Sequence, residues 1–206
     1  MTQQQQLQDL LADGSVWRSS MLRSRGIRPQ AIADALAAGH VAQVSRGFYY
    51  RPDSGVAHEF ASLIAACGRM SQGLACLLSA AHLAGLSSQP PKQPWIALPP
   101  GVHGSSACGQ SGRLLRWSYE GAFEIGVEER RIGGTVIRYT GPARTLIDLV
   151  RYGRHMDGLA TAAEAARSFV TGGGMFAEVV IIAEKLRVPD DTLRRLEALQ
   201  VTIPMA

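Results

Sequence analysis

The chain contains few cysteines and lacks the spacings that bind metal. Only three occur among 206 residues, Cys67, Cys76 and Cys108, and none forms a C-x-x-C pair. An odd, widely spaced set predicts free thiols rather than a disulfide framework or a zinc site, as is usual in the reducing cytoplasm. We therefore expect a cytoplasmic protein without a structural metal.

Long apolar runs are also missing. No stretch approaches the roughly 20 apolar residues that a membrane-spanning helix requires, and the opening MTQQQQLQDLL lacks the basic region of a secretory signal. Hydrophobic residues nevertheless make up 46% of the chain, which is enough to build folded cores. These features predict a folded protein with no membrane association.

The sequence lacks complete catalytic motifs. The glycine cluster at 101–112 has neither a lysine nor Walker spacing. The H-E-F-A-S segment at 58–62 has serine where a zinc protease needs its second histidine. His103, Ser105 and Cys108 share a loop without a nucleophile elbow or a partner acid. We therefore predict no catalytic residues, no cofactor and no enzymatic activity.

One enzymatic alternative stays open, a metal-dependent nuclease that uses Glu128, Glu129 and Asp148. Adjacent strand residues face opposite sides of a sheet, so Glu128 and Glu129 do not easily bind one ion. Strand breaks in plasmid DNA incubated with the protein and Mg²⁺ or Mn²⁺ would support this alternative.

Positive charge is concentrated near the N-terminus. Between Gly14 and Pro52 there are six arginines and one acidic residue, Asp34, so this stretch carries a net charge of +5, against +4 for the whole chain. A basic segment on a nearly neutral body is typical of a polyanion-binding module. A basic face that is merely solvated explains the charge equally well.

The spacing of apolar residues in this stretch predicts three helices and a hairpin. Pro29 suits the first position of the third helix, with Ile27 and Ile32 placed as a hydrophobic staple and Gly39 as its C-terminal cap. The runs V-A-Q-V and F-Y-Y-R flank Ser45-Arg46-Gly47, which predicts a hairpin with a three-residue turn. This is the order of a winged helix-turn-helix. The inward-facing residues of the three predicted helices are Leu7, Leu10 and Leu11, then Trp17, Met21 and Leu22, then Ile32, Ala35 and Leu36.

In that fold the third helix enters the major groove and the hairpin contacts the DNA backbone. Arg28 and Gln30 are the predicted base-reading residues, arginine for guanine and glutamine for adenine. Direct readout is expected to be sparse, because the rest of the helix is rich in alanine and Asp34 would repel phosphate. A winged helix used only for protein contact is the alternative. The residues predicted to position the domain on DNA are Arg18, Ser19, Arg23, Arg25, Arg46, Tyr49 and Arg51.

A turn-rich junction, Pro52-Asp53-Ser54-Gly55, divides the chain into predicted domains at 1–52 and 53–206. The predicted fold class is α+β, a winged helix-turn-helix followed by a mixed α/β domain with a small sheet and several helices. The predicted elements are helices at 57–67, 74–84, from Pro142 to Arg151, 158–170, 176–187 and 190–200, strands at 95–98 and 114–119, and a hairpin of 125–132 and 135–140 around Gly133-Gly134.

Charged residues gather on the predicted hairpin and on the helix that follows it. Arg144, Asp148 and Arg151 recur at i, i+4 and i+7 on the face opposite Leu146 and Leu149. They predict a charged helix surface that ties the helix to the hairpin. A functional face is the other interpretation, and its candidate residues are Arg130, Arg131, Arg138, Arg144, Asp148 and Arg151.

An ordered set of motifs resembles the AbiEi-type antitoxins of type IV toxin–antitoxin systems, from the N-terminus to about residue 170. The motifs are Arg25-Gly26-Ile27, R-G-F-Y-Y-R at 46–51, L-L-S-A-A-H-L-A-G-L at 77–86, W-I-A-L-P-P-G at 95–101 and G-P-A-R-T-L-I-D-L at 141–149.

The resemblance implies two activities. Such proteins repress their own operon by binding inverted repeats in promoter DNA through the winged helix. They also counteract a nucleotidyltransferase-like toxin through the C-terminal domain, which makes the charged set above the candidate antitoxin face. This chain departs from the family at the start of the third helix, where Arg28 and Pro29 stand in place of the usual serine or threonine. A repressor with the same architecture but no toxin partner is the alternative, and the neighbouring gene distinguishes the two.

Overall fold

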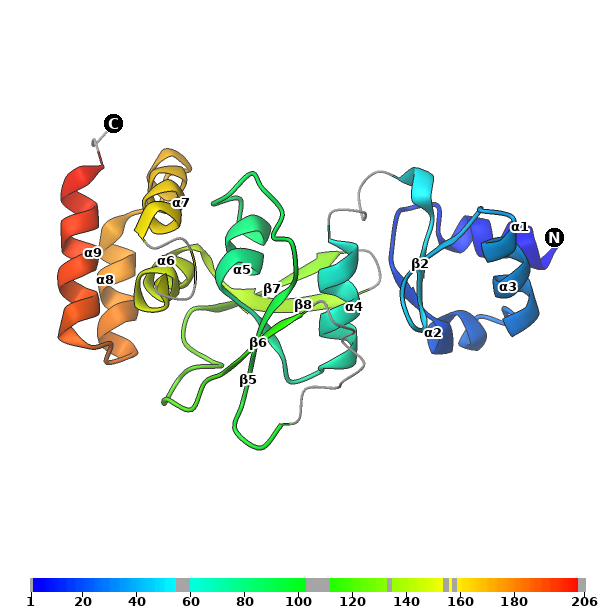
Figure 1. Cartoon of the computed structure of the whole chain (residues 1–206), viewed down its shortest axis with the longest axis horizontal. Helices are drawn as coiled ribbons and strands as arrows, with labels where there is room; N and C mark the ends of the chain where they lie inside the picture. Colours follow the sequence, from blue (N-terminus) through cyan, green and yellow to red (C-terminus); the bar gives the residue numbers. More distant parts are fainter. Residues whose placement is uncertain are drawn as a thin grey trace. The chain divides into compact units, whose positions relative to one another are not determined.

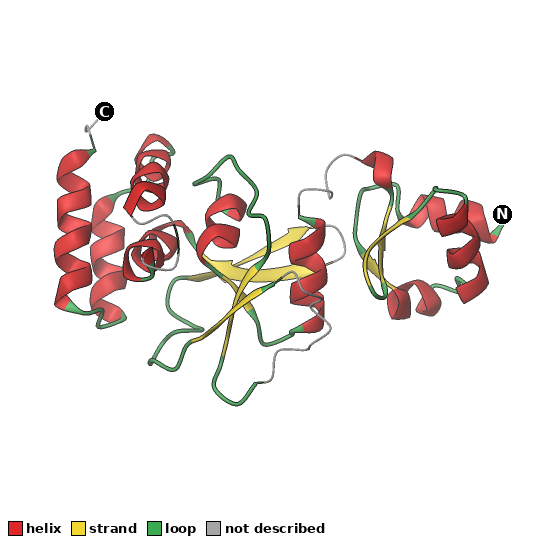
Figure 2. Cartoon of the chain, in the orientation of Figure 1, coloured by secondary structure: helices red, strands yellow, loops and turns green. Residues whose placement is uncertain are grey.

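The protein combines separate helices with two small sheets, so the prediction of an α+β fold is confirmed (Figure 2). The computed structural model describes residues 2–54, 60–102, 112–132, 135–153, 156 and 159–203. These divide into two compact units. The first unit holds residues 2–54, 60–71, 112, 130–132 and 135–137, and the second holds 72–102, 113–129, 138–153, 156 and 159–203.

The first unit begins with three helices and a three-stranded antiparallel sheet in the order β1-β3-β2 (Figure 1). This element order matches that of winged helix-turn-helix domains. Most of the predicted inner stripe lies in one core, which includes Leu7, Leu22, Ile27 and Ile32. The elements are α1 (Gln3–Leu10), β1 (Trp17–Arg18), α2 (Ser19–Ser24), α3 (Pro29–Ala37), β2 (Ala42–Ser45), β3 (Phe48–Tyr50), the 3₁₀ turn η1 (Pro52–Ser54) and α4 (Ala61–Arg69).

Two local predictions for this unit are wrong. Trp17 lies in strand β1 and pairs with Tyr49 of β3, whereas it was expected in the second helix. The hairpin turn is two residues long, Arg46 and Gly47, because β2 extends through Ser45 with an irregularity in its register. A strand of two residues has no periodicity of its own, and only its partner β3 defines it.

A five-stranded sheet has the order β6-β5-β4-β8-β7, and its strands β4, β5 and β6 belong to the second unit. The strand β4 pairs antiparallel with β5 and parallel with β8, and β5 pairs parallel with β6. The strands predicted at 95–98 and in the hairpin are present, while the strand predicted at 114–119 ends at Arg116. The predicted turn Gly133-Gly134 lies outside the described residues. The strands are β4 (Leu74–Ala75), β5 (Trp95–Leu98), β6 (Arg113–Arg116), β7 (Val127–Ile132) and β8 (Thr135–Thr140).

The single helix predicted at 74–84 is instead the strand β4 followed by helix α5 (Leu77–Leu83). Leu74 and Ala75 are completely buried between two neighbouring strands. Cys76 N–H donates to Trp95 O at 3.0 Å. A strand buried on both faces shows no alternation of polar and apolar residues, so periodicity cannot separate it from the helix that follows.

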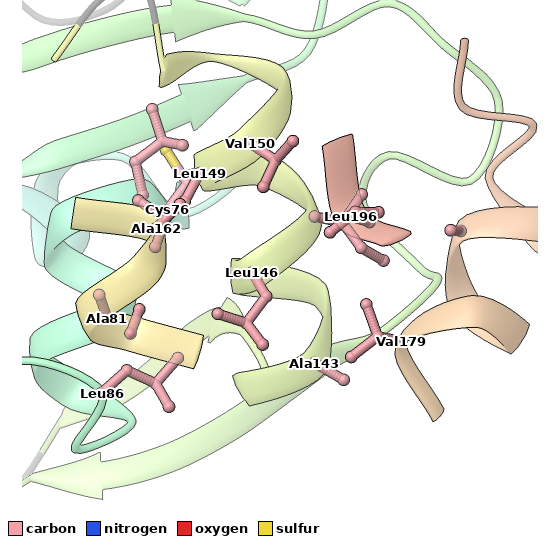
Figure 3. Packing of buried hydrophobic residues seen from close by; sticks show 14 of the residues in the cluster. Cys76, Ala81, Leu86, Ala143, Leu146, Leu149, Val150, Ala162, Val179 and Leu196 are labelled. Carbon is pink, nitrogen blue, oxygen red and sulfur yellow. The ribbon is translucent and has the colours of Figure 1, made fainter. Parts of the chain in front are cut away.

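The C-terminal part is helical, and α6 lies at its centre. Leu146 and Val150 of α6 pack among Ala162 of α7, Val179 of α8 and Leu196 of α9 (Figure 3). The predicted helical state of the Val179–Ile182 segment is confirmed. The helices are α6 (Pro142–Arg151), α7 (Leu159–Thr171), α8 (Phe176–Lys185) and α9 (Asp190–Thr202). Among the helices in the described ranges, each is too short or too polar to cross a bilayer.

Candidate nucleic-acid interface

The turn between α2 and α3 is built as its sequence predicts. Arg28 is the N-cap of α3 and Pro29 its first residue, so Ile27 and Ile32 occupy the two staple positions. Both isoleucines are buried in the same core, which defines the angle at which the chain enters α3. Gly26 has φ +84°, a conformation that favours glycine. Arg28 therefore lies immediately before the first turn of α3.

The glutamines of α1 hold this turn through its backbone. Gln3 Nε2 donates to Gly26 O at 3.0 Å, and Gln3 Oε1 accepts from Arg28 N–H at 2.9 Å. Gln6 Nε2 donates to Arg25 O at 3.1 Å. The sequence alone predicts no role for these residues, because nothing in a short glutamine run indicates which backbone atoms it will meet. They help to position the segment that carries Arg25 and Arg28.

The exposed side of α3 carries a pair of polar residues. Gln30 lies in the first turn, and its Nε2 donates to Asp34 Oδ1 at 2.8 Å. Residues four apart are neighbours on a helix surface, and such pairs stabilise it by about 0.2–0.5 kcal/mol. Gln30, Ala33 and Asp34 are all exposed, so this face is available to a ligand.

A groove of about 300 Å³ runs along α3 and brings several predicted DNA contacts together. Ser19 and Arg23 of α2 and Tyr49 of β3 line it opposite the α3 residues. Ser19 N–H donates to Gly47 O at 2.9 Å, which connects the start of α2 to the hairpin turn. The α3 side of the groove consists of Pro29, Ile32, Ala33 and Leu36.

Aromatic rings hold two of the predicted phosphate-contacting arginines. The Cζ atom of Arg18 lies 5.4 Å from the ring centroid of Phe48, and that of Arg25 lies 5.6 Å from the ring centroid of Trp17. A guanidinium over an aromatic face is attracted by the ring quadrupole. Both arginines remain exposed, so they are oriented and still accessible. The exposed members of the predicted DNA-contacting set are Arg18, Arg23, Arg25, Arg28, Gln30 and Arg46, and the half-buried members are Ser19, Tyr49 and Arg51.

Arg69, in the last turn of α4, supports the hairpin and was not singled out from the sequence. It bonds to Ser45 Oγ at 3.2 Å and to Arg46 O, and its Cζ atom lies 5.2 Å from the ring centroid of Phe48. A Cβ added at Gly68 would meet Phe48 at 2.8 Å, so glycine permits this close packing. Helix α4 therefore contacts the hairpin directly. The proposed domain limits 1–52 and 53–206 stay a prediction.

The second unit buries an ion pair where the sequence predicts a charged helix surface. Arg144 and Asp148 are 0% exposed, and Arg144 Nε donates to Asp148 Oδ2 at 3.0 Å. The surface prediction for these two residues is therefore wrong. The reason is that the segment around Tyr119–Ile125 covers this face of α6, and Arg144 bonds to Tyr119 Oη and Ile125 O.

The remaining members of the candidate antitoxin face are accessible to different degrees. Arg130 and Arg131 are exposed on β7, and Arg138 and Arg151 are half-buried. Arg138 Nη2 donates to Phe123 O at 2.6 Å. The Cζ atom of Arg151 lies 4.2 Å from the ring centroid of Tyr119. Their role in opposing a toxin stays a prediction.

Burial changes the ionisation of this cluster. It raises the pKa of Asp148 from 3.8 to about 6, although Arg144 acts in the opposite direction. Desolvation also raises the pKa of Tyr119, so its phenol stays neutral at physiological pH. Within the described part of the chain, Asp148 Oδ1 has no hydrogen-bond partner, which is consistent with the raised pKa.

Asp148 makes stability depend on pH in a defined direction. The pKa of Asp148 in the folded state lies above its value in the unfolded state. Its contribution to the free energy of unfolding is therefore complete below pH 3.8 and is lost as the pH rises through about 6. We expect the free energy of unfolding to fall by on the order of 3 kcal/mol across this window. Urea titrations between pH 3.5 and 7.5 measure the change, and Asp148→Asn should lack it. An identical pH profile in the two proteins would contradict the assignment.

The nuclease alternative gains no support from the described residues, which include no group of three or more His, Cys, Asp or Glu side chains able to hold a metal ion. Glu128 is exposed and accepts from Tyr139 Oη at 2.6 Å, while Asp148 pairs with Arg144. His103, Ser105 and Cys108 lie outside the described residues. The absence of enzymatic activity stays a prediction.

Comparison with protein families assigns most of the second unit to one family. The model of the AbiEi antitoxin C-terminal domain matches residues 74–198, more than half of the chain. The chain belongs to the AbiEi antitoxin C-terminal domain family. The resemblance found in the sequence motifs is thereby confirmed, and membership implies an antitoxin whose partner, in general terms, is a toxin. The whole of helix α6, with the buried Arg144–Asp148 pair, lies within the matched residues 74–198.

A solved structure supports the fold of this AbiEi protein. The crystal structure of the RV2827C protein from Mycobacterium tuberculosis is similar, with a TM-score of 0.64 at 17% identity. The match covers 97% of this chain and 76% of that one. At this identity the likeness shows the fold alone. No curated protein sequence matches the chain.

Proposed function

We propose that this AbiEi protein is a cytoplasmic antitoxin that binds promoter DNA, represses its own toxin–antitoxin operon and counteracts a nucleotidyltransferase-like toxin. The observation that carries the proposal is the AbiEi match at 74–198, together with a basic N-terminal unit. In that unit residues 14–52 include five exposed arginines, and Gln30, Ala33 and Asp34 of α3 are exposed as well. The expected DNA target is an inverted repeat in the promoter. The toxin is a functional partner, whether or not the two proteins touch.

Two measurements test the proposal. In the first, a bacterial host expresses the reading frame adjacent to this gene, either alone or together with this chain. The host should stop growing when the adjacent frame is expressed alone, and it should grow again when this chain is co-expressed. In the second, the full chain is titrated onto the region upstream of its gene, and a shifted complex should form at a lower concentration than on random DNA of equal length. Failure of both measurements would refute the proposal.

The alternative is a winged-helix repressor of a neighbouring operon without a toxin. The exposed basic side chains of the N-terminal unit support it equally well. A promoter shift combined with harmless expression of the adjacent reading frame would favour this alternative.

Substitutions should separate backbone contacts from base contacts. Arg46 is exposed in the hairpin turn, so Arg46→Ala should weaken binding to operator and random DNA by the same factor, because phosphates carry no sequence information. Arg28→Ala and Gln30→Ala should instead reduce the preference for the operator by about 1–3 kcal/mol. Fluorescence anisotropy titrations with both DNAs give, for each variant, the ratio of its affinity for the operator to its affinity for random DNA.

Arg167→Ala is the matched control, because it removes one exposed arginine from α7 of the other unit. It should leave both affinities unchanged. Equal losses on operator and random DNA for the Arg28 and Gln30 variants would mean that α3 is not the base-reading element.

A further inference from the structure

The polar pair on α3 restricts the orientation of the Gln30 amide. Gln30 Nε2 lies 2.8 Å from Asp34 Oδ1 and donates to it. Rotating the amide by half a turn would bring two acceptor oxygens together, which is unfavourable. Asp34 therefore selects one of two amide orientations that have the same shape. Within the described residues, Gln30 forms no other side-chain hydrogen bond, so its Oε1 is left to accept from a ligand.

The selected orientation suits adenine and not guanine. In the major groove adenine presents the N6 donor and the N7 acceptor, whereas guanine presents two acceptors, N7 and O6. The outward Oε1 of Gln30 can accept from adenine N6–H. The second hydrogen of Nε2 remains for adenine N7. Guanine would place O6 against Oε1, so two acceptors would meet.

The α3 residues that line the groove are apolar. Ala33 is exposed beside Gln30 and lines the α3 groove together with Pro29 and Leu36. Alanine suits contact with the methyl group of thymine. Helix α3 itself contains no lysine or arginine, and these are the side chains that most often read guanine.

We propose that Asp34 is a specificity-determining residue, which holds Gln30 in the orientation that reads adenine and so makes α3 recognise an A·T base pair. This inference depends on the proposed DNA-binding function. It changes the meaning of Asp34 from a charge that opposes binding to one that positions the base-reading residue.

The experiment measures binding of the full chain to its promoter repeat by anisotropy at one fixed salt concentration. Each A·T pair of the repeat is replaced in turn by G·C. For the wild type, replacement of one pair in each half-site should weaken binding at least tenfold. With 7-deazaadenine, which lacks the N7 acceptor, at that position the wild type should also bind more weakly, and Gln30→Ala should not respond.

Variants at position 34 then separate orientation from charge. Asp34→Ala should reduce the tenfold discrimination to less than about threefold, because the amide is free to turn. Asp34→Asn also removes the charge, and its amide can turn either to accept from or to donate to Gln30, so it should lose the discrimination as Asp34→Ala does. The double variant Gln30→Ala/Asp34→Ala should discriminate no worse than Gln30→Ala alone. Asp9→Ala, which removes an exposed carboxylate from α1, controls for net charge.

Three results would overturn the inference. One is that Asp34→Ala and Asp34→Asn tighten binding to every DNA equally and leave the discrimination intact, as a simple repulsive charge would. Another is that no A·T pair depends on Gln30. The third is that the wild type binds no promoter DNA. This result also refutes the proposed function, and the titration of the wild type alone reveals it before any variant is compared.

Discussion

Replacing Arg144 with methionine should destabilise the protein by about 3–5 kcal/mol at neutral pH, because Asp148 would be buried without its counter-charge and would have to take up a proton. Both residues are 0% exposed. Arg144 is also the donor to Ile125 O at 2.6 Å, to Tyr119 Oη at 2.7 Å and to Ala122 O at 3.4 Å. All of these acceptors would lose this donor in the variant. The loss should appear as a lower urea midpoint in circular dichroism.

Matched variants identify the cause of the loss. Asp148→Leu in the Arg144→Met background removes the second charge, and should recover much of the stability, since well-packed apolar pairs often replace buried ion pairs. Arg167→Met, on the exposed face of α7, should change the unfolding free energy by less than about 0.5 kcal/mol. If Arg144→Met were as stable as Arg167→Met, the ion pair would not support the second unit.

Affinity for promoter DNA should fall about 500-fold per bound chain when the salt concentration rises from 50 to 200 mM. Five arginines are predicted to contact phosphates in each bound chain, Arg18, Arg23, Arg25, Arg46 and Arg51, and each contact releases a counterion. The slope of log K against log salt should therefore be about −4.5 per chain, and about twice that for two chains on an inverted repeat. Anisotropy titrations at four or more salt concentrations give the slope.

The variants make the salt prediction specific to individual residues. Arg46→Ala should reduce the slope by about 1 per bound chain. Gln30→Ala should leave it unchanged, because glutamine displaces no counterion. Unfolding of the first unit would weaken binding by both variants at every salt concentration, so circular dichroism of each variant accompanies the titration. A slope near zero for the wild type would contradict a phosphate-based interface.

The sequence predicts best where structure depends on neighbours along the chain. Pro29, Ile27 and Ile32 form the predicted start of α3, because caps and staples involve residues within one turn. The helical state of the Val179–Ile182 segment was predicted for the same reason, since its helix-forming neighbours outweigh its β propensity.

Only the tertiary structure decided which short segments are strands. β1 and β4 have two residues each, and their partners lie far along the chain, at Phe48–Tyr50 and Trp95–Leu98. No local pattern indicates such pairing. The same holds for the contacts of Gln3 and Arg69, whose partners are backbone atoms more than 20 residues away.

By itself, the sequence determined that this protein has a basic N-terminal unit, an α+β fold and AbiEi motifs, because charge, periodicity and motif order are properties of the chain. The tertiary structure decided what the charges do. It buried Arg144 and Asp148 under the segment at 119–125 and left Gln30 and Asp34 exposed on α3. Whether a charge is solvated, paired or aimed at a ligand depends on which other elements cover it, and spacing along one helix does not contain that information.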